Sequence, residues 1–199
     1  MKRIISLLLV AVSLLLLPSC NKDKSYDEAE VKEAAKALIR DAAVYNDIFW
    51  GKGIPYIEDS NFSNGIYYAA DETYLEKMGF SKLDDIYVKA AGIYSEDYLD
   101  SIYIGMSTSG NVRYYQETEY IMVNSKYEPF LKDEVKYLYD TIEMLGYDGD
   151  VLELEITVKV TRDGDTQTRE RKIDLVKEDG RWQIDSATYT TYRPESTQK

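Results

Sequence analysis

The clearest pattern in the chain is a strict alternation of apolar and polar residues near its C-terminal end. Over residues 152–161, every apolar residue is followed by a glutamate, a lysine or a threonine, which is typical of a strand with one buried face. Asp163-Gly164 then predicts a tight turn into a returning strand over residues 169–177. Asp179-Gly180 predicts a second turn into a last strand over residues 181–192. These residues therefore predict a meander of antiparallel strands.

The first part of the chain shows a helical period instead. Ser25 followed by Glu28 has the spacing of a capping box, which opens a helix. Gly51 and Gly53 are expected to end that helix after about 24 residues. Ser95 and Ser81 predict the caps of two shorter helices. One apolar stripe runs along the first helix, at alternating steps of four and three residues: Val31, Ala35, Leu38, Ala42, Tyr45 and Phe49.

Shorter apolar runs predict further strands between the helices and the meander. They cover residues 65–70, 112–124 and 137–144. Most helices are therefore expected before most strands along the chain. The alternating strands are expected to expose one face to solvent. This order predicts an α+β fold in which N-terminal helices pack on a curved antiparallel sheet.

The end of the chain, "IDLVKEDGRWQIDSATY", resembles the last hairpin of the NTF2-like (cystatin-like) superfamily. In that superfamily a polar strand turns at a glycine, a tryptophan follows, and the final strand closes a cone-shaped sheet around a long N-terminal helix. The resemblance implies one such domain over residues 26–192. It implies no activity, since a fold does not determine a function.

The N-terminus has the features of an export signal. Lys2 and Arg3 precede an uncharged stretch, Ile4 to Leu17, which is too short to span a bilayer and suits a signal peptide. The run Leu17-Pro18-Ser19-Cys20 resembles the lipobox of bacterial lipoproteins. The resemblance implies cleavage after residue 19 and a lipid on Cys20, and the alternative is an ordinary secretory signal.

This resemblance also gives the expected organisation and location of the chain. Residues 1–19 would be the lipoprotein signal peptide, residues 20–25 a lipidated tether, and residues 193–199 a flexible tail. The mature protein would be held by its lipid on the extracytoplasmic side of a membrane of the bacterial cell envelope. Its partners would then include the membrane itself.

Charge narrows the set of partners. Once Lys2 and Arg3 leave with the signal peptide, 22 basic residues remain against 36 acidic ones. A strongly acidic surface repels phosphate backbones, so we expect no nucleic-acid partner. Basic protein surfaces would be favoured, although acidity also serves solubility alone.

Composition excludes most catalytic chemistry. The chain has no histidine and one cysteine, so it has no Ser-His-Asp triad, no Cys-His pair and no histidine-ligated zinc site. The two "DGD" runs lack the glycine and glutamate spacing of an EF-hand. We therefore expect no catalytic residue, no metal site and no cofactor. The remaining enzymatic hypothesis is a buried aspartate with a raised pKa beside a tyrosine.

Aromatic residues are the best candidates for binding. The stretch "IFWGKGIPY" places Phe49, Trp50 and Tyr56 beside flexible glycines, and tryptophan and tyrosine are favoured interface anchors. The alternative for Trp50 is a helix end packed over the sheet. Tyr114 and Tyr115 are adjacent in a predicted strand, so they face opposite ways and one could be exposed.

The middle of the chain suggests one type of partner. "FSKLDDIYVKAAGIYSEDYLDSIY" followed by "RYYQETEYIMVN" resembles the secreted inhibitors of cell-wall DL-endopeptidases. That resemblance implies a non-catalytic domain that plugs a peptidase groove, and the lipobox is a departure from the family. The sequence therefore favours a protein-binding role. A protein of this kind is expected to carry an exposed acidic and aromatic patch. The alternative is a small-ligand or glycan-binding domain with a tyrosine-lined pocket between helix and sheet.

Overall fold

The structure is a computed structural model that describes residues 26–58, 64–107, 112–148 and 150–193. The predicted signal peptide, the lipobox with Cys20, and the tether of residues 20–25 lie outside these ranges. So does the predicted tail after Arg193. Those predictions therefore remain predictions, and the fold is described for the residues from Tyr26 onward.

A long N-terminal helix, α2 (Glu28–Phe49), forms as its apolar stripe predicts. Its cap is Asp27 rather than Ser25: the Asp27 side chain accepts hydrogen bonds from the backbone of Ala29 and Glu30 at 2.8 and 3.2 Å. The buried stripe also differs by one position, because Ile39 is buried where Leu38 was expected. The helix ends at Phe49, before the two glycines, as predicted.

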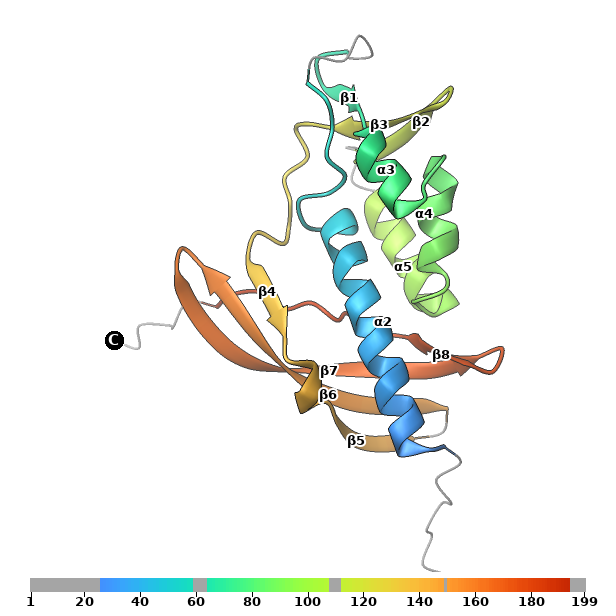
Figure 1. Cartoon of the computed structure of the whole chain (residues 1–199), viewed down its shortest axis with the longest axis vertical. Coiled ribbons are helices and arrows are strands. Elements are labelled where there is room, and N and C mark those ends of the chain that lie inside the picture. The colour runs from blue at the N-terminus through green and yellow to red at the C-terminus, as the bar shows by residue number, and fades with distance from the viewer. Residues whose placement is uncertain (1–25, 59–63, 108–111, 149, 194–199) are drawn as a thin grey trace, which may run out of the picture.

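The alternating segment forms a large curved sheet (Figure 1). Its strands follow the order β4-β6-β7-β8, and β5 pairs with the other half of β6. All pairings are antiparallel. The strands are β4 (Glu134–Tyr137), β5 (Glu143–Asp148), β6 (Val151–Arg162), β7 (Asp165–Glu178) and β8 (Arg181–Ile184).

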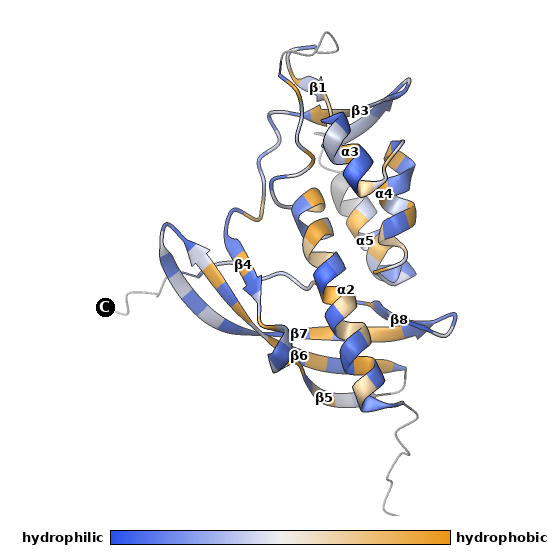
Figure 2. Ribbon diagram, viewed as in Figure 1, coloured by the Kyte–Doolittle hydropathy of each residue, from blue (hydrophilic) through white to orange (hydrophobic). Residues whose placement is uncertain are grey.

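The alternation along β6 buries one face of the strand, as predicted. Its five apolar side chains from Leu152 to Val160 are fully buried, and they give the strand its striped colouring in Figure 2. Both predicted turns are present, and Asp163 and Asp179 adopt positive φ angles of 52° and 49° before their glycines. That geometry matches the twist of a tight hairpin.

Two strand predictions in this region are wrong in extent. The segment 137–144 is broken by a 3-10 turn, η2 (Tyr139–Thr141), which separates β4 from β5. The predicted strand 181–192 stops at Ile184. Residues 185–193 continue as an extended segment, here called the C-terminal strap, which passes between α2 and the sheet (Figure 1).

A second, smaller sheet lies beyond the C-terminal end of α2. The predicted strand 112–124 is a hairpin in this sheet, because Thr118 turns the chain at a φ of 53°. Ser95 caps its helix as predicted, through a bond from the Tyr98 amide, whereas the helix after Ser81 is capped by Asp85. The elements are β1 (Tyr67–Ala69), α3 (Glu72–Met78), α4 (Leu83–Ala90), α5 (Glu96–Ser107), β2 (Tyr114–Glu117) and β3 (Tyr120–Asn124).

The whole arrangement is an α+β fold with helices packed on curved antiparallel sheets, as the sequence predicts. The sequence pattern did not reveal α3, whose seven residues include no buried side chain. One core joins α2, the shorter helices and both sheets. It leaves the C-terminal half of α2 facing β4 and the strap, and the candidate site lies there.

Candidate functional site

A crevice of about 620 Å³ opens between the C-terminal half of α2 and β4. Its walls come from α2, from the loop after α2, from the connection between β3 and β4, from β4 and from the strap. Charged and apolar groups both line it. The lining residues are Ala43, Asn46, Asp47, Lys52, Pro129, Leu131, Lys132, Asp133, Glu134, Val135, Tyr137 and Tyr189.

Three aromatic rings cluster beside this crevice: Tyr189 is part of its lining, and the Trp50 and Phe130 rings both pack against Tyr189. The Trp50 and Tyr189 ring centroids are 4.8 Å apart, and the Phe130 ring lies edge-on to Tyr189 at 6.0 Å. Phe130 is 61% exposed. The Leu131 amide donates to the Trp50 carbonyl oxygen at 2.8 Å, so the loop that carries Phe130 is fixed on the end of α2. We call Trp50, Phe130 and Tyr189 the aromatic rim.

A buried polar network closes the back of the crevice. The Asn46 side-chain amide donates to Thr188 Oγ1 at 2.8 Å and to the Tyr137 hydroxyl at 3.3 Å. Tyr137 in turn donates to the Thr188 carbonyl oxygen. Burial raises the pKa of Tyr137, so its hydroxyl stays protonated as a donor. Tyr137 and Tyr189 are the tyrosines that line the crevice between helix and sheet, where the sequence suggested a tyrosine-lined pocket.

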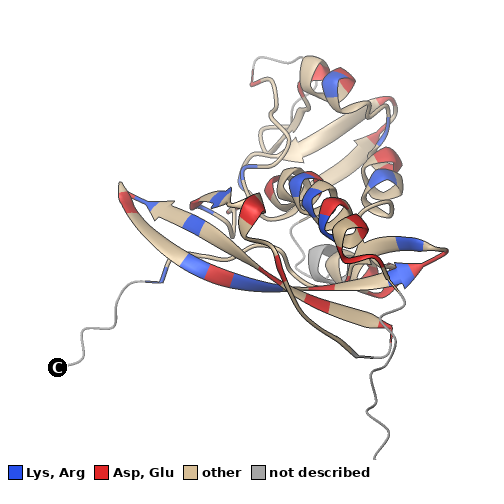
Figure 3. Cartoon of the chain, turned by 60° about the horizontal axis from the view of Figure 1, so that its bottom comes forward, with Lys and Arg blue, Asp and Glu red and all other residues tan. Residues whose placement is uncertain are grey.

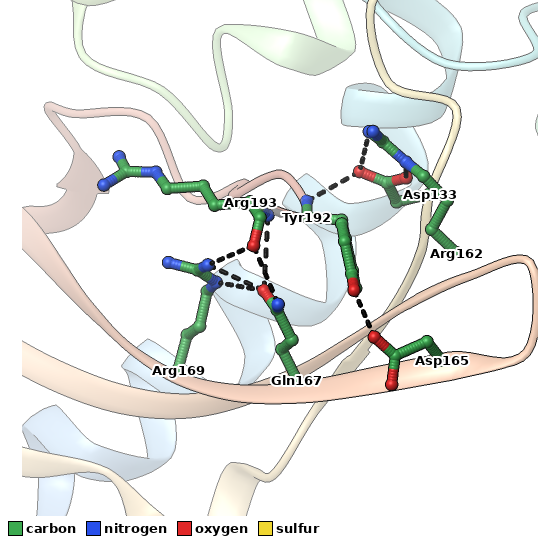
Figure 4. Close-up of polar contacts among 7 residues, drawn as sticks. All are labelled: Asp133, Arg162, Asp165, Gln167, Arg169, Tyr192 and Arg193. Carbon is green, nitrogen blue, oxygen red and sulfur yellow. Dashed lines mark hydrogen bonds and ion pairs between the residues drawn. The ribbon is translucent and has the colours of Figure 1, made fainter. Parts of the chain in front are cut away.

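The strap is tied to the sheet at its far end by several polar contacts (Figure 4). Asp133 accepts bonds from Arg162 at 2.5 and 2.9 Å and from the Tyr192 amide at 2.7 Å. The Tyr192 hydroxyl donates to Asp165, and Gln167 bonds the backbone of Arg193. The strap therefore forms a fixed wall of the crevice.

Neutralising Asp133 should loosen this wall. The Arg162 guanidinium and the Tyr192 amide lower the Asp133 pKa, so its stabilising contribution is present at neutral pH and is lost as the pH falls through that lowered value. Asp133→Asn should reduce the free energy of unfolding by about 1 kcal/mol at pH 7, a modest figure because Arg162 is partly exposed to solvent. Urea titrations at pH 7 and at successively lower pH should show the difference shrink as the pH falls through the lowered Asp133 pKa.

A matched control for this prediction is Glu128→Gln. Glu128 makes an exposed ion pair with Lys132 at 2.9 Å on the same connection, and such pairs contribute little. We expect no measurable change for it at any pH of the series. A loss for Asp133→Asn that stays the same at every pH would show that its charge has no part in holding the strap.

The structure separates the aromatic residues that the sequence selected. Trp50 lies on the rim, half-buried. Phe49 and Tyr114 are buried in the core, so they support the site without being available at the surface. Tyr56 stacks on Tyr68, and Tyr115 lies edge-on to Tyr67; both belong to the region of the small sheet. Of the adjacent pair 114 and 115, one is buried and one partly exposed, as the alternation predicts.

Several residues in or beside the crevice were not expected from the sequence. Phe130 lies in a polar connection and Tyr189 in a predicted strand, and neither position carries a local signal of exposure or contact. Asn46, in contrast, can be recognised in the sequence, because it is a polar residue on the buried face of an amphipathic helix. A buried amide needs partners, so its position could have indicated an internal polar network.

An acid–base enzyme would be expected to hold a carboxylate with a raised pKa in the crevice. Asp133, which lines the crevice, has a lowered pKa instead. Asp174 has a raised pKa, caused by burial and by Glu153 and Asp185, but it lines a separate hollow on the sheet with Leu145 and Val151. In the described ranges, no three side chains of the histidine, cysteine, aspartate or glutamate type gather as a metal site.

Charges of both signs alternate along the exposed side of α2 and along the β6–β7 hairpin (Figure 3). On α2, Lys36 and Glu33 lie 2.9 Å apart and Lys32 and Glu28 lie 3.8 Å apart. These elements therefore present mixed charge. Among the described helices, none is long and apolar enough to cross a membrane.

Comparison with known proteins adds no family to these observations. No protein-family model matches the chain, and no curated protein matches it significantly. The functional argument therefore rests on the residues and on their geometry.

Proposed function

We propose that this chain is a non-catalytic, lipid-anchored binding protein of the bacterial cell envelope, and that a protein partner binds at the crevice. The observation that carries the proposal is the exposed Phe130 ring beside Trp50 and Tyr189. Exposed aromatic side chains next to a concave surface are the usual anchors of protein interfaces. The long helix inside a curved sheet also supports the NTF2-like resemblance.

The position of the crevice suits a protein held at its N-terminus. The 22 residues of α2 extend about 33 Å at 1.5 Å per residue. The proposed anchor precedes the start of this helix, and the crevice lies beside its C-terminal half. With Cys20 in a bilayer, the helix would present the crevice away from the lipid surface, where a soluble partner could reach it.

The first partner to test is a cell-wall DL-endopeptidase from the same bacterium. Residues 21–199, without the lipid, would be titrated into a digest of purified peptidoglycan by that enzyme. Loss of activity at a one-to-one ratio is the expected result and would support an inhibitor. Unchanged digestion at a large excess would exclude that enzyme as the target.

Phe130 provides the sharpest test of the binding surface. Phe130→Ser should weaken partner binding at least tenfold, because the partner would lose an aromatic anchor that it buries on binding. Its melting temperature should stay close to that of the wild type, since the ring is mostly exposed. Calorimetric titration and thermal melting would measure the two effects.

Val88→Ser is the control for this prediction. Val88 is 71% exposed on α4, away from the crevice lining, so its substitution removes apolar surface without touching the rim. Binding should be unchanged for Val88→Ser. Equal affinity of Phe130→Ser and the wild type would move the interface elsewhere on the molecule.

A glycan or small ligand is the second candidate, and the crevice volume favours it. Ligand sites commonly occupy several hundred Å³ and combine aromatic walls with a few polar groups, and the crevice has both. Soluble peptidoglycan fragments would be titrated while the fluorescence of the protein is followed, because Trp50 lies on the rim. Saturable binding without inhibition of the peptidase would favour this alternative.

A further inference from the structure

We propose that the protein partner binds as an extended strand added to the free edge of β4. This inference rests on the proposed function, because it specifies how a protein would occupy the crevice. It concerns the backbone of β4 rather than the aromatic rim. The two can therefore be tested apart.

The hydrogen-bonding pattern shows which backbone groups of β4 point outward. Leu138, just after β4, donates its amide to the Thr157 carbonyl oxygen of β6 at 3.0 Å. Residues of an antiparallel strand alternate between facing the partner strand and facing away. With Tyr137 opposite Val158 and Val135 opposite Val160, the N–H and C=O groups of Tyr137 and Val135 face away from β6.

That outer edge has no strand beside it within the described part of the chain. β4 pairs with β6 alone, and β5 continues along β6 without touching β4's other side. An edge of this kind is a template for another strand, since its backbone groups retain unused hydrogen-bonding capacity. Figure 1 shows β4 to the side of α2, at the edge of the large sheet.

The crevice runs along this edge. Residues 131–135 and Tyr137 form one wall, and Ala43, Asn46 and Asp47 of α2 form the other. A paired strand needs a separation of about 4.8 Å from β4. The small Ala43 side chain leaves depth on the helix side, and the volume of about 620 Å³ accommodates a few residues of extended chain.

The two faces of β4 define the side chains that such a strand would carry. Val135 and Tyr137 face the interior, where Tyr189 also lies, so residues opposite them should be apolar. Glu134 and Lys136 face solvent, so the intervening residues should be polar. The expected occupant is a segment of alternating apolar and polar residues, a form of recognition that uses main-chain bonds for affinity and side chains for specificity.

A peptide also fits this edge better than a sugar does. The outward groups of Val135 and Tyr137 repeat along the strand at the two-residue spacing of a polypeptide backbone. A second strand can match several of them at once. A glycan has no such repeat of alternating donors and acceptors.

The test uses peptide binding to residues 21–199 and two substitutions at one position. A displayed library of random twelve-residue peptides would be selected on the wild-type protein, and the enriched peptides synthesised. Val135→Pro removes the outward N–H and places a ring on the edge, while Val135→Ala keeps the N–H and shortens the side chain. We expect binding at least tenfold weaker for Val135→Pro and within threefold for Val135→Ala.

Hydrogen exchange on the wild-type protein provides a readout that needs no substitution. A bound selected peptide should slow exchange of the Val135 and Tyr137 amides, whose bonds it completes. Thermal melting would confirm that Val135→Pro is folded. The inference is overturned if no alternating peptide is enriched, if Val135→Pro binds as tightly as the wild type, or if those two amides exchange at unchanged rates.

The outcomes also separate this inference from the proposed function. A protein partner whose binding depends on Phe130 but not on Val135→Pro would uphold the function and reject strand addition. Peptide binding at β4 without any effect on the peptidase would uphold strand addition and reject the inhibitor role.

Discussion

Replacing Arg113 by methionine is expected to lower the free energy of unfolding by about 2–4 kcal/mol, a large fraction of the 5–15 kcal/mol of a typical domain. Arg113 is buried at the end of α2. Its guanidinium donates to the Phe49 carbonyl oxygen at 2.9 Å and to the Gly51 carbonyl oxygen at 2.6 Å. Methionine keeps the apolar stem but leaves both acceptors unpaired.

The surroundings of Arg113 explain why the loss should be large. A cation is stabilised at a helix C-terminus by the partial negative charge there, and the guanidinium also lies 4.5 Å from the Tyr127 ring centroid. Gly53 is required next to it, because a Cβ at that position would lie 2.2 Å from Arg113 Nη2. The arginine thus holds the turn that presents Trp50 and Lys52 to the crevice.

Urea denaturation would measure this effect, with Arg181→Met as the control. Arg181 is exposed at the start of β8, and its loss should change stability by less than about 0.5 kcal/mol. Arg113→Lys should fall between the two, because an ammonium group cannot span both carbonyls with a planar fork. If Arg113→Met were as stable as the wild type, the guanidinium would have no capping role.

The second large effect concerns the proposed lipid anchor at Cys20. Cys20→Ser is expected to move the protein from the membrane fraction to the soluble fraction of the envelope or to the medium. Each buried methylene of an acyl chain contributes about 0.8 kcal/mol, and two chains hold a protein firmly in a bilayer. Serine offers no thiol for the lipid, so that whole contribution would be lost.

Fractionation of the expressing bacterium, followed by detergent phase separation, would measure the change. Asn21→Ser is the matched control, because it alters the neighbouring residue and keeps the thiol; it should remain in the membrane fraction. If Cys20→Ser stayed with the membrane as the wild type does, the prediction of a lipobox would be wrong. If the wild type itself were soluble, the N-terminus would be an ordinary secretory signal.

The binding candidates show how far local patterns lead. Trp50 is partly buried against Tyr189, whereas its neighbour Phe49 is fully buried. Both lie at the C-terminal end of the same helix, and residue type does not tell them apart. Only the packing of α2 against the core decides which of two adjacent rings reaches the surface.

The partners of Trp50 lie far away along the chain. Phe130 and Tyr189 come from a connection and from the strap, and they meet Trp50 because α2, β4 and the strap converge. The free edge of β4 is equally non-local, because it depends on which strands pair and which do not. No periodicity in the sequence carries that information.

The sequence by itself determined the α+β class, the long helix and the β6–β7 meander. It could do so because these features depend on local repeats: side chains alternate at every residue of a strand and recur every three to four residues in a helix. Tertiary structure alone decided the split of residues 112–124 into a hairpin, the strap in place of a last strand, and the crevice. Those features depend on contacts between distant segments, and local propensity gives way where such contacts bury more surface.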